Sequence, residues 1–177
     1  MSLKNANGRY DLLIEMAVQL ARTAHQGQVR KYAKEPYIVH PESVARIVST
    51  VPHDVEMIAA AWLHDVVEDT SVTIEMIEAG FGHDVAGLVA DLTSKRIGTN
   101  RAARKQTDKQ RLSAASSRAK TIKLADILDN LPSIIEHDKG FARIYVAEKR
   151  DLLEALTDGD MSLYTAANNL IEGFVCD

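Results

Sequence analysis

The chain has 177 residues and a formal net charge of −4, with 46% apolar and 26% charged residues. This length suits one domain with a substantial core, and the composition excludes disordered and low-complexity proteins. The longest apolar run, Met57–Leu63, is far shorter than the roughly 20 residues of a membrane span, so no membrane association is expected. The N-terminus lacks the apolar stretch of a signal peptide, and the single cysteine, Cys176, excludes an intramolecular disulfide. We therefore expect a cytoplasmic protein.

Apolar residues recur with the helical period of 3.6 along the chain, and strand-like alternation is hard to find. Pro41 suits a first helical turn, and Asp54 and Thr73 are placed to cap the helices that follow them. No internal repeat or long linker divides the chain. The sequence therefore predicts a single all-α domain over residues 1–177, with helices at about 10–26, 41–51, 55–67, 73–79, 85–93, 101–115, 119–135, 141–156 and 163–173.

Positive charge is concentrated between Lys95 and Lys123. This segment has ten basic residues and one acid, Asp108, which gives it a net charge of +9 and leaves −13 for the rest of the chain. Such a charge run is commonly a solvated helix face. Two alternatives stay open: a wall that binds a phosphate-rich ligand, and a nucleic-acid surface, which the lack of aromatic residues in the segment does not favour.

Four of the six histidines are followed by aspartate, so a His-Asp pair alone does not single out a site. Three of these pairs lie at expected helix ends, where capping explains them. The fourth, His64-Asp65, interrupts an apolar helix in AAWLHDVVEDT, and Glu68 and Asp69 follow at helical spacing. Carboxylates that close together are costly without a cation between them. A metal ion therefore explains this cluster better than a core histidine beside a polar helix end.

A mononuclear metal site needs further ligands, and two candidates lie on or beside apolar helices. His40 ends the stretch EPYIVH at an expected helix entrance. Asp126 interrupts the apolar helix TIKLADILDNL, four residues before Asn130, although its position alone fits a helix surface equally well. The four candidates together offer two imidazoles and two carboxylates: His40, His64, Asp65 and Asp126. This combination of ligands suits Mn, Fe, Zn or Mg.

These motifs follow one another in a fixed order: His25, Arg30-Lys31, EPYIVHP over 35–41, AAWLHDVVEDT over 60–70 and KLADILDN over 123–130. The pattern resembles that of the HD-domain phosphohydrolases, and within them the hydrolase domain of RelA/SpoT-type alarmone enzymes. The resemblance covers about residues 10–135 and implies an all-α helical bundle that helices at about 141–173 complete. Longer members continue into a synthetase domain where this chain ends. The chain is therefore similar to the stand-alone small alarmone hydrolases, and synthesis is not expected.

The resemblance implies roles for the matching positions. The ligands of the family's divalent ion, usually Mn²⁺, match His40, His64, Asp65 and Asp126. The pair that handles the attacking water matches Glu68 and Asp69. The positions that contact the nucleotide match Arg30, Lys31 and Asn130. The implied reaction is hydrolysis of the 3′-pyrophosphate of ppGpp or pppGpp, which gives GDP or GTP and pyrophosphate.

The chain departs from the family pattern at a few positions. The loop that leads to His40 is one residue longer than in common members, which affects the register of Arg30 and Lys31. Ile127 and Asp129 stand where bifunctional enzymes often have a basic residue and a histidine. These departures bear on purine selectivity more than on the metal site. Outside the matched set, His25 is expected to cap a helix or lie at the surface, with a functional role as the alternative. Lys123 is expected at the surface, with a contact to the reacting phosphate as the alternative. Tyr145 is expected in the core, with a phosphate-facing hydroxyl as the alternative.

Other functions stay open beside the alarmone hydrolase. A related substrate, either an adenine alarmone of the ppApp type or the 2′-phosphate of NADPH, would use the same metal residues. A non-catalytic nucleotide sensor is expected to have lost some of the residues that hold the metal or the water, and none is lost. A nucleic-acid-binding protein would use the basic segment instead. The prediction is a metal-dependent enzyme with a nucleotide substrate, and the apolar pattern of residues 141–173 suggests a homodimer.

Overall fold

The computed structural model describes residues 4–95 and 97–174. Within those ranges the chain forms ten helices, and its only extended pairing is an isolated bridge between Val29 and Pro36. The all-α prediction is confirmed, and Cys176 lies outside the described residues. The helices are α1 (Lys4–Ala24), α2 (Val39–Val48), α3 (Val55–Leu63), α4 (Val66–Asp69), α5 (Ile74–Phe81), α6 (His83–Leu92), α7 (Arg101–Ala114), α8 (Ser117–His137), α9 (Lys139–Leu153) and α10 (Met161–Glu172).

One predicted helix, residues 55–67, is wrong, because α3 ends at Leu63 and α4 begins at Val66. The start of α3 is as predicted: the Asp54 carboxylate accepts a hydrogen bond from the backbone N–H of Met57 at 2.9 Å. At the other end, His64 Nδ1 lies 2.8 Å from the carbonyl oxygen of Ala61, so the side chain satisfies a carbonyl of the last turn. The polar pair 64–65 therefore forms a turn between two helices instead of one face of a single helix.

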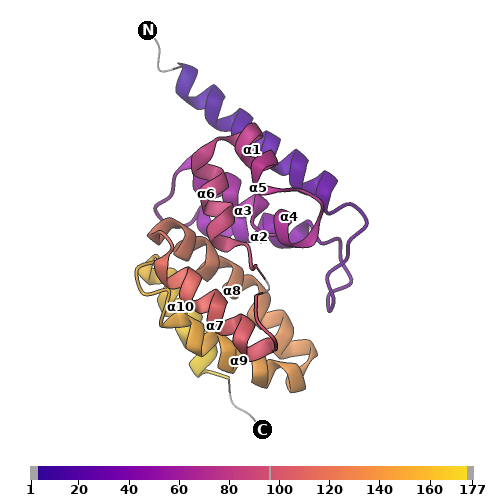
Figure 1. The fold of residues 1–177 in the computed structure, drawn as a ribbon, viewed down its shortest axis with the longest axis vertical. Coiled ribbons are helices and arrows are strands. Elements are labelled where there is room, and N and C mark those ends of the chain that lie inside the picture. The colour runs from indigo at the N-terminus through magenta and orange to yellow at the C-terminus, as the bar shows by residue number, and fades with distance from the viewer. Residues whose placement is uncertain (1–3, 96, 175–177) are drawn as a thin grey trace.

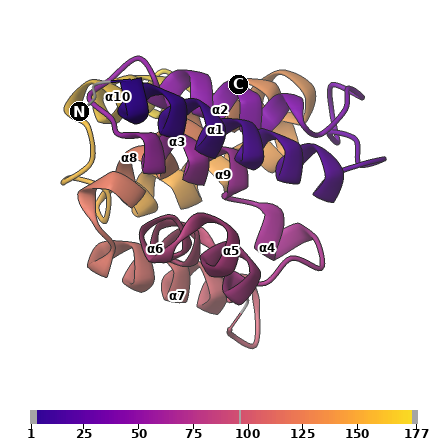
Figure 2. The same cartoon turned by 90° about the horizontal axis from the view of Figure 1, so that it is seen from above.

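Two helices, α3 and α8, organise the packing. Helix α3 packs against α1, α2 and α6, and α8 packs against α2, α9 and α10 (Figure 1). Figure 2 shows α5, α6 and α7 on one side and α1 and α2 on the opposite side, with α3 and α8 between them. This arrangement brings α2, the end of α3 and the middle of α8 together, although they are far apart in the sequence.

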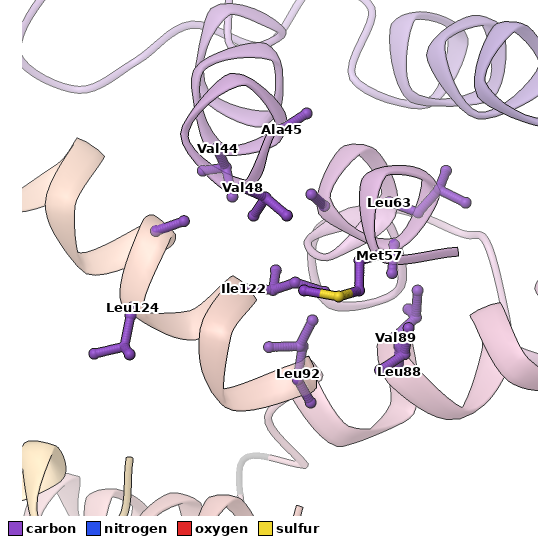
Figure 3. Close-up of a cluster of buried hydrophobic side chains, with 14 of the residues drawn as sticks. Val44, Ala45, Val48, Met57, Leu63, Leu88, Val89, Leu92, Ile122 and Leu124 are labelled. Carbon is purple, nitrogen blue, oxygen red and sulfur yellow. The ribbon is translucent and has the colours of Figure 1, made fainter. Parts of the chain in front are cut away.

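The core fixes these helices relative to one another. Residues 59–61 of α3 are three fully buried alanines, whose small side chains let neighbouring helices approach closely. Figure 3 shows side chains from four helices that point toward a common centre, among them Val48 of α2, Met57 of α3, Leu92 of α6 and Ile122 of α8. Tight packing of this kind holds side chains at the ends of these helices in defined positions.

The described part of the chain contains no helix that is long and apolar enough to cross a bilayer. Helices α9 and α10 pack on α8, as expected for C-terminal helices that complete the core. This packing supports one domain over residues 1–177, an extent that stays a prediction.

Candidate metal centre

The structure brings the four predicted metal ligands together from three segments. His40 lies in the first turn of α2, His64 and Asp65 form the turn between α3 and α4, and Asp126 lies in the middle of α8. His40, His64 and Asp126 are buried, with 2–5% of their surface exposed. The Asp65 side chain keeps 22% exposed, which leaves one side of the cluster open.

The donor atoms of these residues are spaced as a shared cation requires. His40 Nε2 lies 3.2 Å from His64 Nε2, 3.4 Å from Asp65 Oδ2 and 3.3 Å from Asp126 Oδ1. His64 Nε2 lies 3.2 Å from Asp65 Oδ2 and 3.9 Å from Asp126 Oδ1. An ion at about 2.0–2.2 Å from nitrogen and oxygen ligands holds neighbouring ligand atoms about 3.0–3.4 Å apart. His40, His64 and Asp65 can therefore hold one divalent metal ion, and Asp126 lies beside them as the fourth predicted ligand.

The outer nitrogens of both imidazoles are already engaged. His64 Nδ1 donates to the carbonyl oxygen of Ala61, and His40 Nδ1 donates to Asp129 Oδ2 at 2.7 Å. An imidazole whose proton is on Nδ1 presents a lone pair at Nε2. Two such lone pairs that face each other cannot form a hydrogen bond, but both can bind one cation.

The charges of the surrounding side chains favour a cation between these four residues. Burial raises the pKa of Asp126, but Lys123 and His40 lower it well below its usual value. Burial also raises the pKa of Asp65, and His64 and His40 lower that pKa well below its usual value. Burial lowers the pKa of His40, yet its hydrogen bonds to these carboxylates and to Asp129 hold that pKa well above its usual value. A proton or a metal ion therefore neutralises the pair of carboxylates, and metal binding displaces the proton.

Polar side chains around the cluster orient its two carboxylates. Asn130 Nδ2 donates to Asp126 Oδ1 at 2.6 Å, and Lys123 Nζ donates to Asp126 Oδ2 at 2.6 Å. The expectation of a surface position for Lys123 is therefore wrong, since its ammonium is held against a ligand. The Tyr37 hydroxyl donates to Asp65 Oδ2, and burial together with Asp65 raises the pKa of Tyr37, so its hydroxyl keeps its proton.

A cavity of about 700 Å³ lies beside the cluster. Its lining includes Asp65 and Asp126 together with the predicted water-handling pair, Glu68 and Asp69. The backbone N–H of Ser94 donates to Glu68 Oε2 at 3.1 Å, which fixes this carboxylate at the cavity wall. Asp65 and Asp69 lie one helical turn apart, as their spacing predicts, since the backbone N–H of Asp69 donates to the carbonyl oxygen of Asp65 at 3.0 Å. The short helix α4 carries Glu68 and Asp69 to the cavity.

A family model described as HD domain matches residues 17–153 of the chain. The chain belongs to the HD-domain family. The match confirms the resemblance inferred from the sequence motifs, and it covers the helices that carry all four predicted ligands, from α2 to α8.

Two relatives of this HD domain have the same name. Over 70 residues it is 53% identical to a guanosine-3′,5′-bis(diphosphate) 3′-pyrophosphohydrolase of Vibrio cholerae, an alignment that covers 40% of this chain and 10% of that enzyme. It is 42% identical over 122 residues to an enzyme of the same name from Xenopus tropicalis, covering 67% of this chain and 68% of that one. The chain thus spans about a tenth of the bacterial relative and about two thirds of the frog relative.

Solved structures share the fold of this HD domain. One, described as a metazoan ortholog of SpoT that hydrolyses ppGpp, superposes with a TM-score of 0.84 at 30% identity and covers 91% of this chain and 94% of that chain. A second, from Listeria monocytogenes, superposes with a TM-score of 0.66 at 28% identity and covers 78% of this chain and 95% of that one.

The three predicted nucleotide-contacting residues lie in different settings in the HD domain. Arg30 is held inside, with Nη1 at 2.9 Å from Asp129 Oδ2 and Nη2 at 3.3 Å from Asn130 Oδ1. Lys31 lies at the surface with 72% of its side chain exposed, and its ammonium is 4.6 Å from the centre of the Tyr32 ring. Asn130 lines the cavity beside Asp126.

Most cations of the basic segment are paired with acids. A solvated helix face explains only part of the basic segment, because several side chains of this segment also line the cavity. Arg96 lies outside the described residues. The pairs that reach other helices or loops join Arg101 to Glu148, Lys109 to Asp151 and Glu154, Arg118 to Asp54 and Asp84, and Lys120 to Asp158.

Several side chains at the site were not predicted or were predicted wrongly. His25 is 3% exposed and packs its ring 4.7 Å from the Tyr37 ring, so a capping or surface role is wrong. Tyr145 packs on the core as expected and also lines the cavity. Tyr37 and Asp129 hold the predicted ligands Asp65 and His40, a role that the sequence did not indicate for either of them.

Proposed function

We propose that this HD domain is a metal-dependent hydrolase that removes the 3′-pyrophosphate of ppGpp or pppGpp and leaves GDP or GTP. The observation that supports this function best is the convergence of four ligand atoms at the wall of a cavity that also contains Glu68 and several cations. A negatively charged ligand set beside positively charged walls suits a polyphosphate substrate bound against a divalent ion. The names of the relatives support the choice of this alarmone.

The residues divide the chemistry between them. A divalent ion held by His40, His64, Asp65 and Asp126, for which we propose Mn²⁺, supplies Lewis-acid charge and lowers the pKa of water. Glu68 accepts a proton from the attacking water as general base, and Asp69 orients that water. The water oxygen bonds to the phosphorus next to the 3′ oxygen, and the bond between that phosphorus and the 3′ oxygen breaks. The proton held by Glu68 then passes to the departing 3′ oxygen.

The nucleotide contacts follow from where the side chains lie. Asn130 contacts the nucleotide from the cavity wall, and Lys31 does so from the exposed surface. Arg30 acts through Asp129 and Asn130, since its guanidinium is hydrogen-bonded to both. A cytoplasmic location and a homodimer stay predictions.

The test is pyrophosphate release from ppGpp by metal-stripped protein, with and without added Mn²⁺. Release is expected only with the metal, and Asp65→Asn is expected to abolish it. The chain offers a matched control in Asp84→Asn, because Asp84 also follows a histidine but has 61% of its side chain exposed and pairs with Arg118 away from the cavity. Release that does not need the metal, or that survives in Asp65→Asn, contradicts the proposal.

Parallel substrates test the base and the phosphate position. Metal-dependent turnover of ppApp in preference to ppGpp would show that the enzyme prefers adenine to guanine. Metal-dependent phosphate release from NADPH, without pyrophosphate release from ppGpp, would support the metal site but assign it a different substrate. Tight nucleotide binding with no turnover of any of the three would indicate a sensor.

A further inference from the structure

Two largely buried cations of the cavity have donors without an acceptor. Arg101, Lys109 and Lys123 line the cavity, and each is paired with a carboxylate at 2.9 Å or less. Lys105 lines it too, but its side chain is 43% exposed and lies 3.7 Å from Asp108. Lys149 of α9 lines the same cavity without an ion pair, and Arg111 of α7 has only a long contact with Asp108. Buried donors without an acceptor are expensive, so both side chains call for an explanation.

Lys149 is the clearer case. Only 7% of its surface is exposed, and among the described residues no carboxylate or hydrogen-bond acceptor contacts its ammonium. Its ammonium lies over the ring of Tyr145, whose centre is 4.6 Å from Nζ. Burial, with Lys123 adding to it, lowers the pKa of Lys149 to about 7.

Arg111 gives independent support from the neighbouring helix. Its Nε and Nη1 atoms are buried and find no acceptor in the described part of the chain. Its Nη2 atom makes only a long contact, 3.5 Å, with Asp108. The planar fork of a guanidinium matches phosphate oxygens, so a reorientation of the Arg111 side chain would bring these donors to an oxyanion in the cavity.

We propose that Lys149 and Arg111 form an anion subsite of the cavity that binds a diphosphate group. The inference rests on the proposed function for the identity of its ligand. The substrate carries one diphosphate that leaves from the 3′ position and another that stays at the 5′ position, and both have the chemistry that this subsite accepts. A bound diphosphate supplies the acceptors that both side chains lack.

The experiment measures binding to the metal-loaded protein by isothermal titration calorimetry, with GDP, guanosine and inorganic pyrophosphate as probes. The variants are Lys149→Met and Arg111→Met, with Lys149→Arg as the charge-preserving variant and Lys139→Met, at an exposed position on α9, as the control. Loss of a charge-assisted hydrogen bond is expected to weaken binding about tenfold or more in both methionine variants. Lys149→Arg and Lys139→Met should bind as the wild type does.

The probes separate the two sources of the diphosphate. Weaker binding of GDP, with guanosine unaffected, assigns the subsite to the 5′-diphosphate, and weaker binding of pyrophosphate alone assigns it to the leaving group. Unchanged affinity for both probes in Lys149→Met overturns the proposal. Because binding is measured without turnover, the proposal can fail while the alarmone hydrolase stands, and it can hold if ppGpp is not the substrate.

Discussion

Asp129 accepts a hydrogen bond from Nδ1 of His40 at 2.7 Å, on the side of the ring opposite the nitrogen that faces the metal cluster. Arg30 Nη1 lies 2.9 Å from the same carboxylate oxygen. Burial raises the pKa of Asp129, but His40 and Arg30 lower it below its usual value, so the carboxylate stays ionised. A ligand imidazole that is held by a carboxylate keeps its orientation and donates more strongly to a metal.

Asp129→Asn is therefore expected to weaken Mn²⁺ binding by about 10- to 100-fold, as changes to such supporting groups generally do. Calorimetric titration of the metal-stripped protein measures this directly. Asp158→Asn serves as the control, because Asp158 has 71% of its side chain exposed and pairs with Lys120. Equal metal affinity in both variants would show that Asp129 only packs against His40.

Glu68→Gln separates proton transfer from metal binding. The amide keeps the shape of the side chain but cannot accept a proton, so kcat for ppGpp is expected to fall by about 10²- to 10⁴-fold. Affinity for Mn²⁺ should stay at the wild-type value, because Glu68 is not among the four ligands. A parallel loss of metal affinity would instead place Glu68 in the coordination sphere.

Metal binding should be visible in thermal stability. An ion present at about 100 times its Kd stabilises the folded state by about 2.7 kcal/mol, which corresponds to a rise in Tm of about 5–10 °C for a domain of this size. Differential scanning calorimetry with and without Mn²⁺ measures the shift. Asp84→Asn should show the full rise and Asp65→Asn little of it. The idea fails if Asp65→Asn responds as strongly as the wild type.

Lys149 makes stability depend on pH with a defined sign. Its pKa is about 7 in the folded protein and has an ordinary value of 10.5, so the unfolded chain binds more protons between these two values. Stability of the wild type should therefore rise with pH across this window. At or below pH 7 Lys149→Met should be more stable than the wild type by about 5 kcal/mol.

Urea unfolding at pH 7 and at pH 9.5 tests this dependence in the metal-free protein. The difference in unfolding free energy between Lys149→Met and the wild type should be smaller at pH 9.5, because the buried Lys149 is then neutral in the folded protein. Lys139→Met should show no such change. Besides burial, Lys123 and Lys105 lower the pKa of Lys149, and Asp126 and Glu148 raise it. A difference in unfolding free energy that stays constant with pH would mean that the two carboxylates hold its charge at neutral pH.

The sequence predicted correctly those features that follow from a local pattern of residues. Helical periodicity predicted the all-α fold, and the isolated polar residues on apolar helices, such as Asp126, pointed to the cluster. It failed at His64-Asp65, because helical spacing continues through the pair and only the contact with the Ala61 carbonyl reveals the turn. It could not identify Lys149, since a lysine in an amphipathic pattern normally reaches solvent and its burial depends on how α9 packs.

The proposed metal ligands come from three segments that the chain separates widely, the start of α2, the turn after α3 and the middle of α8. An ion at this point joins these segments as a cross-link would, and its binding free energy adds to the free energy of folding. A molecule without the ion opens more often and offers its backbone to proteases. The supply of metal in the cell would then set the lifetime of each molecule as well as its rate of turnover.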